Sequence, residues 1–307
     1  MRKYVKTPTV FQMEATECGA ASLSMIFSYY GKHLPLEQMR IETGVSRDGC
    51  NARNMMRAAK KYGFDGVELR HVEKNVKLWE LPAFGSASSL AESKKKFDDA
   101  GLKVCVVGAS GSFAAAGLER RKEQMDLFKR WAEVAQGLDC RYMRVFGGPV
   151  PEGQSMEETL KWDAEGYNEA FPVIAKYGVT MLFETHDSFS TSGTLVPLLK
   201  KLKGDFGVIW DILHPYRCGE SIGDTWKNLS PWVKHIHIKD SRVFSDKDFD
   251  FMFPGEGKVP IAKIMELLKS GGYQGYYSFE WERGWHPEIP SCELAFPHYV
   301  KYMQSYL

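Results

Sequence analysis

The sequence lacks the long apolar runs that membrane spans and secretory signals need. No stretch approaches the roughly 18 uninterrupted apolar residues of a span, and the N-terminus, MRKYVKTPTVFQMEATE, has no apolar centre. Cysteine is also scarce, because the 307 residues include six widely scattered cysteines and no CxxC pair. This usage argues against a secreted disulfide scaffold and favours reduced thiols. We therefore expect a cytoplasmic protein with no membrane partner.

Charge of either sign is not in excess. The chain has 40 lysines and arginines against 39 aspartates and glutamates, a formal net charge of +1. No overall field would draw in a polyanion, so nucleic acid is disfavoured as a partner and a small-molecule substrate is favoured. The hydrophobic fraction of 44% is ordinary for a globular chain that buries a large core. The composition is compatible with a homo-oligomer as well as a monomer.

From Phe64 to the end, short apolar runs rich in β-formers alternate with longer amphipathic stretches. Residues 118–138, 156–177 and 261–270 carry apolar side chains at the three- and four-residue spacing of helices. Alternating strands and helices predict an α/β fold with a parallel sheet, here a (β/α)8-type TIM barrel. Seven strands are recognisable where such a barrel has eight. They lie at residues 66–70, 103–110, 142–148, 179–186, 206–215, 235–240 and 276–282.

The first 63 residues follow a different pattern. Three short helices are indicated, at residues 18–30, 36–42 and 51–62, and only residues 4–12 show the imperfect alternation of a strand. Two interpretations stay open. Either this segment is a decorated first βα unit, with residues 4–12 as its strand and residues 51–62 as its helix, or it is a separate small helical piece and the first barrel strand is missing.

Four strands end in a side chain that hard metal ions bind, namely Glu184, Asp211, His237 and Glu280. Each lies one βα unit beyond the last. Because the C-terminal strand ends of a barrel converge on one mouth, we expect these four side chains to meet there. Burying so much negative charge is costly unless a cation compensates it. The pattern predicts one divalent ion, and this donor set suits Mn²⁺, Mg²⁺, Co²⁺ or Zn²⁺ without selecting among them.

Further histidines follow the same strands. His214 is placed by the spacing DxxHP to turn back over the mouth and touch substrate. His186 either forms a second layer around the metal or caps its own loop. His235 shares a strand face with His237 but lies one layer deeper, where we expect a structural role.

Charged residues follow His237 directly. Lys239 and Arg242 are candidates for binding sugar hydroxyls, and Asp240 for orienting an imidazole in a second layer. The plainer interpretation of such a charged run is a solvated loop.

Several segments together resemble the xylose-isomerase-like superfamily of sugar isomerases, sugar-phosphate epimerases and DNA-repair endonucleases. They span residues 64–307 and read FDGVELR, GLKVCVVGAS, YMRVFGG, ETHD, WDILHP, HIHIKD, PGEGKVP and YYSFEWERGWHPEIP. The resemblance implies the barrel, the same four metal ligands, and proton transfer by Glu184 and Glu280. The repair branch is disfavoured, because the strand ends GASGSF and VFGG carry no histidine for its additional metals.

In an enzyme of this kind the metal would polarise a sugar carbonyl and its neighbouring hydroxyl, which lowers the cost of an enediolate. Glu184 and Glu280 would approach opposite faces of the carbon and move its proton, giving isomerisation or epimerisation. Arg144, beside two glycines at a strand end, is placed to hold a substrate phosphate or carboxylate. Trp281 is placed to form part of an apolar wall for the sugar, although a core position is the plainer expectation.

Residues 5–63 resemble instead the start of the bacteriocin-processing cysteine peptidases, which precede ABC exporters and cleave double-glycine leaders. The likeness rests on VFQMEATECGAASLSMIFSYYGKHLPLEQMR, with Gln12 as the oxyanion-hole side chain and Cys18 as the nucleophile at a helix N-terminus. The base and its orienting residue belong to that family's second half, where barrel sequence stands here. We expect residues 1–63 to be a truncated, vestigial peptidase-like segment and residues 64–307 the barrel. The alternative function is a remnant peptidase module.

Overall fold

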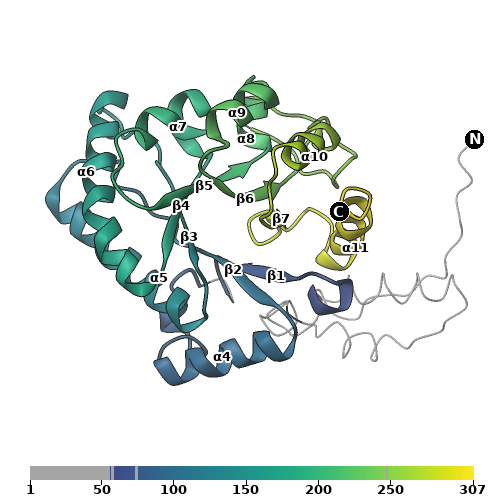
Figure 1. Cartoon of the computed structure of the whole chain (residues 1–307), viewed down its shortest axis with the longest axis horizontal. Helices are drawn as coiled ribbons and strands as arrows, with labels where there is room; N and C mark the ends of the chain where they lie inside the picture. The colour runs from purple at the N-terminus through teal and green to yellow at the C-terminus, as the bar shows by residue number, and fades with distance from the viewer. Residues whose placement is uncertain (1–55, 57–58, 73–74, 247) are drawn as a thin grey trace, which may run out of the picture.

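The computed structural model describes Met56 and residues 59–72, 75–246 and 248–307. Its seven strands form one sheet in chain order, and every neighbouring pair is parallel. Figure 1 shows the sheet curling around a centre, with the helices outside it. The strands are β1 (Gly66–Leu69), β2 (Lys103–Gly108), β3 (Tyr142–Val145), β4 (Thr180–Glu184), β5 (Phe206–Asp211), β6 (Val233–Ile238) and β7 (Tyr277–Phe279). All seven predicted strands and the barrel class are confirmed.

The crossovers between the strands are helical. The predicted helices are confirmed as α5 (Leu118–Gly137), α6 (Met156–Ile174) with the 3-10 turn η2 (Ala175–Tyr177), and α10 (Ile261–Ser270). The other helical elements are η1 (Leu78–Glu80), α4 (Ala87–Asp99), η3 (Asp187–Phe189), α7 (Ser192–Leu199), α8 (Leu213–Arg217), α9 (Ile222–Leu229) and α11 (Cys292–Met303). Among the described residues, no helix combines the length and the apolarity that crossing a bilayer requires.

Helix starts are specified locally. Ser86 before α4 and Ser155 before α6 each form a capping box with the residue three positions later. Thr191 and Ser221 accept hydrogen bonds from backbone N–H groups at the starts of α7 and α9. These caps satisfy N–H groups that a helix leaves unpaired, and so fix where each crossover begins.

The core has two parts because the strands are buried on both faces. Inside the barrel, Cys105, Val106, Leu182 and Ile209 form a small apolar cluster. A larger core lies between sheet and helices, and its largest fully buried side chains include Trp131, Trp210, Tyr167, Phe128 and Phe183. This packing holds the C-terminal strand ends at fixed positions.

Within the described residues the sheet is not closed, since β1 and β7 are its two edges. A cavity of about 800 Å³ lies between them, lined by both strands and by α11. The chain is helical at Met56 and residues 59–62, and Phe64 stacks on Tyr299 of α11 at 5.8 Å between ring centres. The predicted strand at residues 4–12 and the predicted helices at residues 18–30 and 36–42 lie outside the described residues.

Candidate active site

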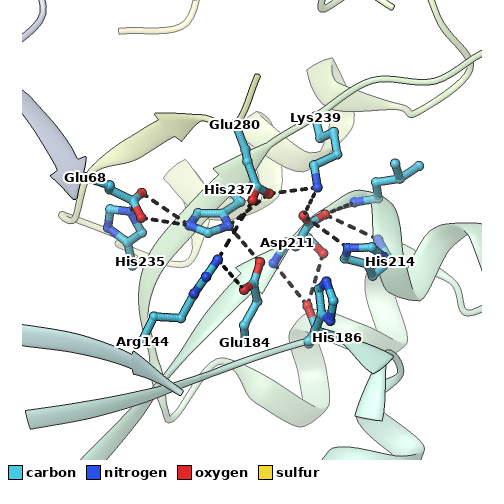
Figure 2. Close-up of polar contacts among 12 residues, drawn as sticks. Glu68, Arg144, Glu184, His186, Asp211, His214, His235, His237, Lys239 and Glu280 are labelled. Carbon is cyan, nitrogen blue, oxygen red and sulfur yellow. Dashed lines mark hydrogen bonds and ion pairs between the residues drawn. The ribbon is translucent and has the colours of Figure 1, made fainter. Parts of the chain in front are cut away.

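The four strand-end side chains lie together at the C-terminal edge of the sheet (Figure 2). Glu184 and Asp211 end β4 and β5, His237 is the last residue but one of β6, and Glu280 directly follows β7. One donor atom from each lies within 4.8 Å of the donor atoms of the other three. Glu184, Asp211 and His237 are buried, and the Glu280 side chain is 14% exposed. The parallel sheet therefore collects an oxygen-rich donor set with one imidazole.

Two buried cations hold the glutamates ionised. Arg144 Nη1 lies 3.1 Å from Glu184 Oε2, and Lys239 Nζ lies 2.8 Å from Glu280 Oε2 and 3.1 Å from Asp211 Oδ2. Burial alone would raise the pKa of Glu184, but Arg144 and His237 bring it below its usual value. Burial likewise opposes ionisation of Glu280, but Lys239 and His237 hold its pKa well below the usual range. Both glutamates are therefore carboxylates at neutral pH.

Asp211 differs from its neighbours. Burial and the negative charges of Glu280 and Glu184 raise the pKa of Asp211 to about 6, although Lys239 opposes the shift. For His237, burial disfavours the charged ring, but the surrounding carboxylates outweigh it and hold its pKa well above the usual value. Asp211 and His237 thus hold protons that a bound metal ion would displace.

Charge and hydrogen bonding both leave room for that cation. Glu184 Oε2, Asp211 Oδ2 and Glu280 Oε2 are buried, and they accept no hydrogen bond beyond their ion-pair contacts with Arg144, Lys239 and His237. Negative groups also outnumber permanent cations in the connected network, whose members are Glu68, Glu184, Asp211, Glu280 and Glu282 against Arg70, Arg144 and Lys239. Unpaired buried carboxylate charge is strongly destabilising. A divalent ion among the four donors fits both observations, and oxygen with imidazole suits Mn²⁺, Mg²⁺, Co²⁺ or Zn²⁺.

His214 presents a free N–H beside these donors. Arg217 Nε donates to His214 Nδ1 at 3.0 Å, so the proton of the neutral ring must be on Nε2. Burial and the nearby Lys239 hold the pKa of His214 well below its usual value, which keeps the ring neutral. Its Nε2 has no hydrogen-bond partner and lies 3.6 Å from Asp211 Oδ2. His214 is therefore a donor available to an oxygen of a bound molecule.

His186 packs against His214, with ring centres 4.8 Å apart. Its Nδ1 lies 2.9 Å from Asp187 Oδ1, but its side chain makes no capping hydrogen bond to the backbone of the following turn. Burial opposes the charged ring, but Asp187 and Glu184 raise the pKa of His186 above its usual value. A second-layer role for His186 therefore stays a prediction.

The residues after β6 divide into two groups. Lys239 lies inside the donor cluster and also contacts Glu282 at 2.9 Å. Asp240 instead accepts hydrogen bonds from the backbone N–H groups of Gly255, Gly257 and Val259, so it clamps a loop where an imidazole partner was expected. The guanidinium of Arg242 lies against Met252 Sδ at 3.0 Å, on an exposed side chain.

Arg144 and Trp281, the other two predicted substrate-binding residues, make polar contacts with other residues of the protein. Arg144 is bound to Glu184 and donates to Ser110 Oγ at 3.2 Å. Trp281 stacks on Phe253 and Phe279 and donates from Nε1 to Pro290 O at 2.8 Å. Gln12 and Cys18, the vestigial peptidase residues, lie outside the described residues.

The sequence reasoning missed Glu68 and Arg70 of the segment GVELR. Arg70 Nη1 lies 3.3 Å from Glu280 Oε1, and Glu68 contacts both His235 and His237. The available signal was a carboxylate in the middle of an otherwise apolar strand, where its charge needs a partner. Phe249 was missed as well. It packs near His214, and Lys239 lies 5.4 Å from the centre of its ring.

Comparisons with known proteins agree with this architecture. The curated relatives that the chain matches include an inosose isomerase of Halalkalibacterium halodurans, 26% identical over 72% of this chain and 79% of the relative. They also include an L-ribulose-5-phosphate 3-epimerase of Salmonella paratyphi B, 26% identical over 78% of this chain and 85% of the relative. A crystal structure of the IolI protein with a bound zinc atom has the same fold, with a TM-score of 0.72 and 20% identity over 87% of this chain and 97% of that one.

Two family models match different parts of the chain. The model of peptidase family C39 matches residues 6–87, so the likeness to cysteine peptidases extends beyond the limit at residue 63 expected from the sequence. The xylose isomerase-like TIM barrel model matches residues 56–295, and the two matches overlap. Since the second match spans most of the chain and agrees with the observed barrel, this protein belongs to the xylose isomerase-like TIM barrel family.

Proposed function

We propose that this protein is a divalent-metal-dependent isomerase or epimerase of sugars or sugar phosphates, acting by proton transfer through an enediolate. The observation that carries the proposal is the meeting of Glu184 and Glu280 with Asp211 and His237, all within 4.8 Å through their donor atoms. The relatives named above act on an inosose and on a ketose phosphate. Their substrates suggest a polyhydroxylated ketone for this chain as well.

The chemistry follows from the charges of the site. When bound, the ion would stabilise the negative charge that develops on two substrate oxygens, that of the carbonyl and that of the neighbouring hydroxyl. Glu184 and Glu280 are ionised, so either can take the proton from the carbon that bears the hydroxyl, next to the carbonyl. Return of the proton to the other face gives the epimer, and return to the neighbouring carbon gives the isomer.

His214 and Lys239 orient the substrate and the bases in this proposal. The unpartnered Nε2–H of His214 donates to a substrate oxygen. Lys239, held between Asp211 and Glu280, fixes the position of the Glu280 carboxylate. A proton-transfer site of this kind depends on orientation within a fraction of an ångström, which the buried ion pairs supply.

Solvent deuterium exchange tests the proposal. The metal-loaded enzyme is incubated in D₂O with a panel of ketoses, ketose phosphates and inososes, and NMR follows deuterium incorporation next to the carbonyl. We expect incorporation with at least one substrate, and its loss in Glu184→Gln and Glu280→Gln. Glu288→Gln, which changes an exposed carboxylate paired with His286, is the matched control. Absence of exchange with every substrate would contradict the proposal.

The match to peptidase family C39 supports a second candidate, a remnant peptidase module in the N-terminal segment. Without the base of that family, we expect no cleavage of a double-glycine leader peptide, and no effect of Cys18→Ala on sugar chemistry. Mass spectrometry of an incubated leader peptide decides this. Cleavage by the wild type that Cys18→Ala abolishes would establish the peptidase instead.

A further inference from the structure

His237 has a carboxylate at each of its two ring nitrogens (Figure 2). Its Nδ1 lies 2.9 Å from Glu184 Oε1 and 3.3 Å from Glu280 Oε2, on the side of the donor cluster. Its Nε2 lies 3.2 Å from Glu68 Oε1 and 3.3 Å from Glu68 Oε2, on the opposite side. The ring therefore separates the candidate metal centre from a carboxylate that the proposed function does not use.

Glu68 comes from an unexpected part of the fold. It lies in β1, at one edge of the sheet, whereas His237 lies in β6 near the other edge. The two meet across the barrel interior. Glu68 Oε1 also contacts Nε2 of His235 at 2.7 Å, and His235 is 1% exposed. The Glu68 side chain is only 21% exposed, and these two imidazoles are the groups that stabilise its charge.

The chemistry of a neutral imidazole decides what Glu68 does. Such a ring has one N–H donor and one lone pair, and a metal takes the lone pair. Nδ1 faces the cluster, so ligation there requires the proton to be on Nε2. An ionised carboxylate only accepts hydrogen bonds, so Glu68 is compatible with a proton on Nε2 and repels a lone pair there. We propose that Glu68 is a positioning residue that fixes His237 as the Nε2–H tautomer and so presents Nδ1 to the metal.

This inference rests on the proposed metal dependence and adds a residue to it. Histidine ligands commonly donate their second N–H to a carboxylate, and loss of such a partner typically weakens metal binding by about 10- to 100-fold. Here the partner comes from outside the four ligand strands. It is also reached from the cavity between β1 and β7, which Glu68 and His235 both line.

The same three residues could also have a different role. Glu68, His235 and His237 themselves form a group of one carboxylate and two imidazoles that could hold an ion. Ligation of His237 at both nitrogens would require a deprotonated imidazolate. The contact of 2.7 Å between Glu68 and His235 is also an ordinary hydrogen-bond distance. The rings of His235 and His237 therefore already supply hydrogen-bond donors to the Glu68 carboxylate. We therefore favour positioning, and a second ion becomes an outcome of the test.

The experiment measures metal affinity in the full-length chain. Protein stripped with a chelator is titrated with Zn²⁺ against a competing indicator for the wild type, Glu68→Ala, Glu68→Gln and Cys105→Ala. Cys105 lines the same cavity from β2 and controls for a change of its wall. We expect about 10- to 100-fold weaker binding for Glu68→Ala. Glu68→Gln should stay near the wild type, because its amide oxygen still accepts from Nε2–H, and Cys105→Ala should be unchanged.

Histidine NMR of the zinc-loaded protein measures the tautomer of His237 directly. A purely structural role of Glu68 would leave that tautomer unchanged. In the wild type the Nε2–H proton of His237 should resonate downfield and exchange slowly, and Glu68→Ala should lose that signal. If Glu68→Ala does not fold, Glu68→Asn takes its place, since its amide is too short to reach the ring.

Three results separate the possibilities. One ion per wild-type chain with unchanged affinity in folded Glu68→Ala would overturn the inference and leave the proposed function standing. Two ions per wild-type chain, one of them lost in both Glu68→Ala and Glu68→Gln, would make Glu68 a ligand and also overturn it. No ion in the wild type would overturn the proposed function itself, and the inference with it.

Discussion

Arg144 Nη1 lies 3.1 Å from Glu184 Oε2, and the two side chains are 3% and 0% exposed. A buried pair of this kind stabilises little by itself, but removing one partner leaves an uncompensated charge in the core. The arginine that the sequence marked for a substrate phosphate is thus already engaged by a candidate base. In the structure Arg144 lowers the pKa of Glu184 and so keeps this carboxylate ionised.

Replacement of Arg144 by methionine should therefore affect the metal-free protein most. We expect Arg144→Met to lower the free energy of unfolding by about 3–5 kcal/mol, because Glu184 would stay buried without its partner. Saturating Zn²⁺ should recover part of the loss. Urea denaturation with and without chelator measures both. A variant as stable as the wild type, with a KM raised for phosphorylated substrates alone, would instead favour the substrate-anchor role.

Glu280→Gln should remove most of the bound metal, because a neutral amide is a weaker ligand than a carboxylate. Elemental analysis of the purified protein is expected to give about one divalent ion per wild-type chain and far less for the variant. Glu288→Gln serves as the exposed control. No metal in the wild type, even after incubation with Mn²⁺ or Co²⁺, would contradict the assignment of a metal site to these residues.

Metal affinity should rise with pH. In the absence of metal, Asp211 has a pKa of about 6 and His237 a pKa well above its usual value, so both groups hold protons that an ion must displace. Each displaced proton strengthens apparent binding about tenfold per pH unit below the pKa of that group. Isothermal titration between pH 5 and 8 should show affinity increasing throughout, with protons released on binding. A flat profile would show that these groups are already deprotonated.

Asp163 provides a test away from the active site. It is fully buried on α6, its Oδ1 accepts from the backbone N–H of Phe113 at 2.9 Å, and burial raises its pKa well above the usual value. The folded state then binds a proton that the unfolded state has released, so stability falls as pH rises between the two pKa values. Asp163→Asn cannot ionise. Its urea midpoint should match that of the wild type near pH 4 and exceed it at pH 8. Equal midpoints of the two proteins at both pH values would contradict the raised pKa of Asp163.

Much of this architecture was predictable because it follows from local pattern. The apolar runs and their spacing indicate the seven strands, and strand ends in a parallel barrel converge, which brings Glu184, Asp211 and Glu280 together. The contacts of Glu68 were not predictable in the same way. They join β1 to β6 across the barrel, and no periodicity along the chain shows which inward-facing side chains meet there.

The role of Asp240 shows a second limit. A carboxylate two residues after a strand end is equally suited to an imidazole and to backbone N–H groups, and the fold of the following loop decides between them. Here that loop brings the N–H groups of Gly255, Gly257 and Val259 to it. The choice depends on the loop's path, which the sequence pattern did not indicate.

The last prediction concerns the open side of the barrel. Strands β1 and β7 are the edges of the described sheet, and a cavity of about 800 Å³ separates them. Exposed strand edges invite aggregation unless something pairs with or covers them. The first described residues of the chain reach this region, because Ala59 and Phe64 line the same cavity. We therefore keep the prediction that residues 4–12, which lie outside the described residues, supply a strand between β1 and β7.

Pro8 makes that strand a weak one, since proline has no N–H to give to a sheet. Even so, removing residues 1–63 should take away both the strand and the helix that leads into β1, and we expect insoluble or metal-free protein. Removal of residues 1–3 alone, which spares the strand, is the matched control and should leave solubility and metal binding unchanged. Solubility, thermal melting and Zn²⁺ titration of the two truncated chains decide the point. If the chain lacking residues 1–63 stays soluble, melts cooperatively and binds zinc as the full chain does, the barrel is stable with its seam open, and the peptidase-like segment is an appendage with no part in closing it.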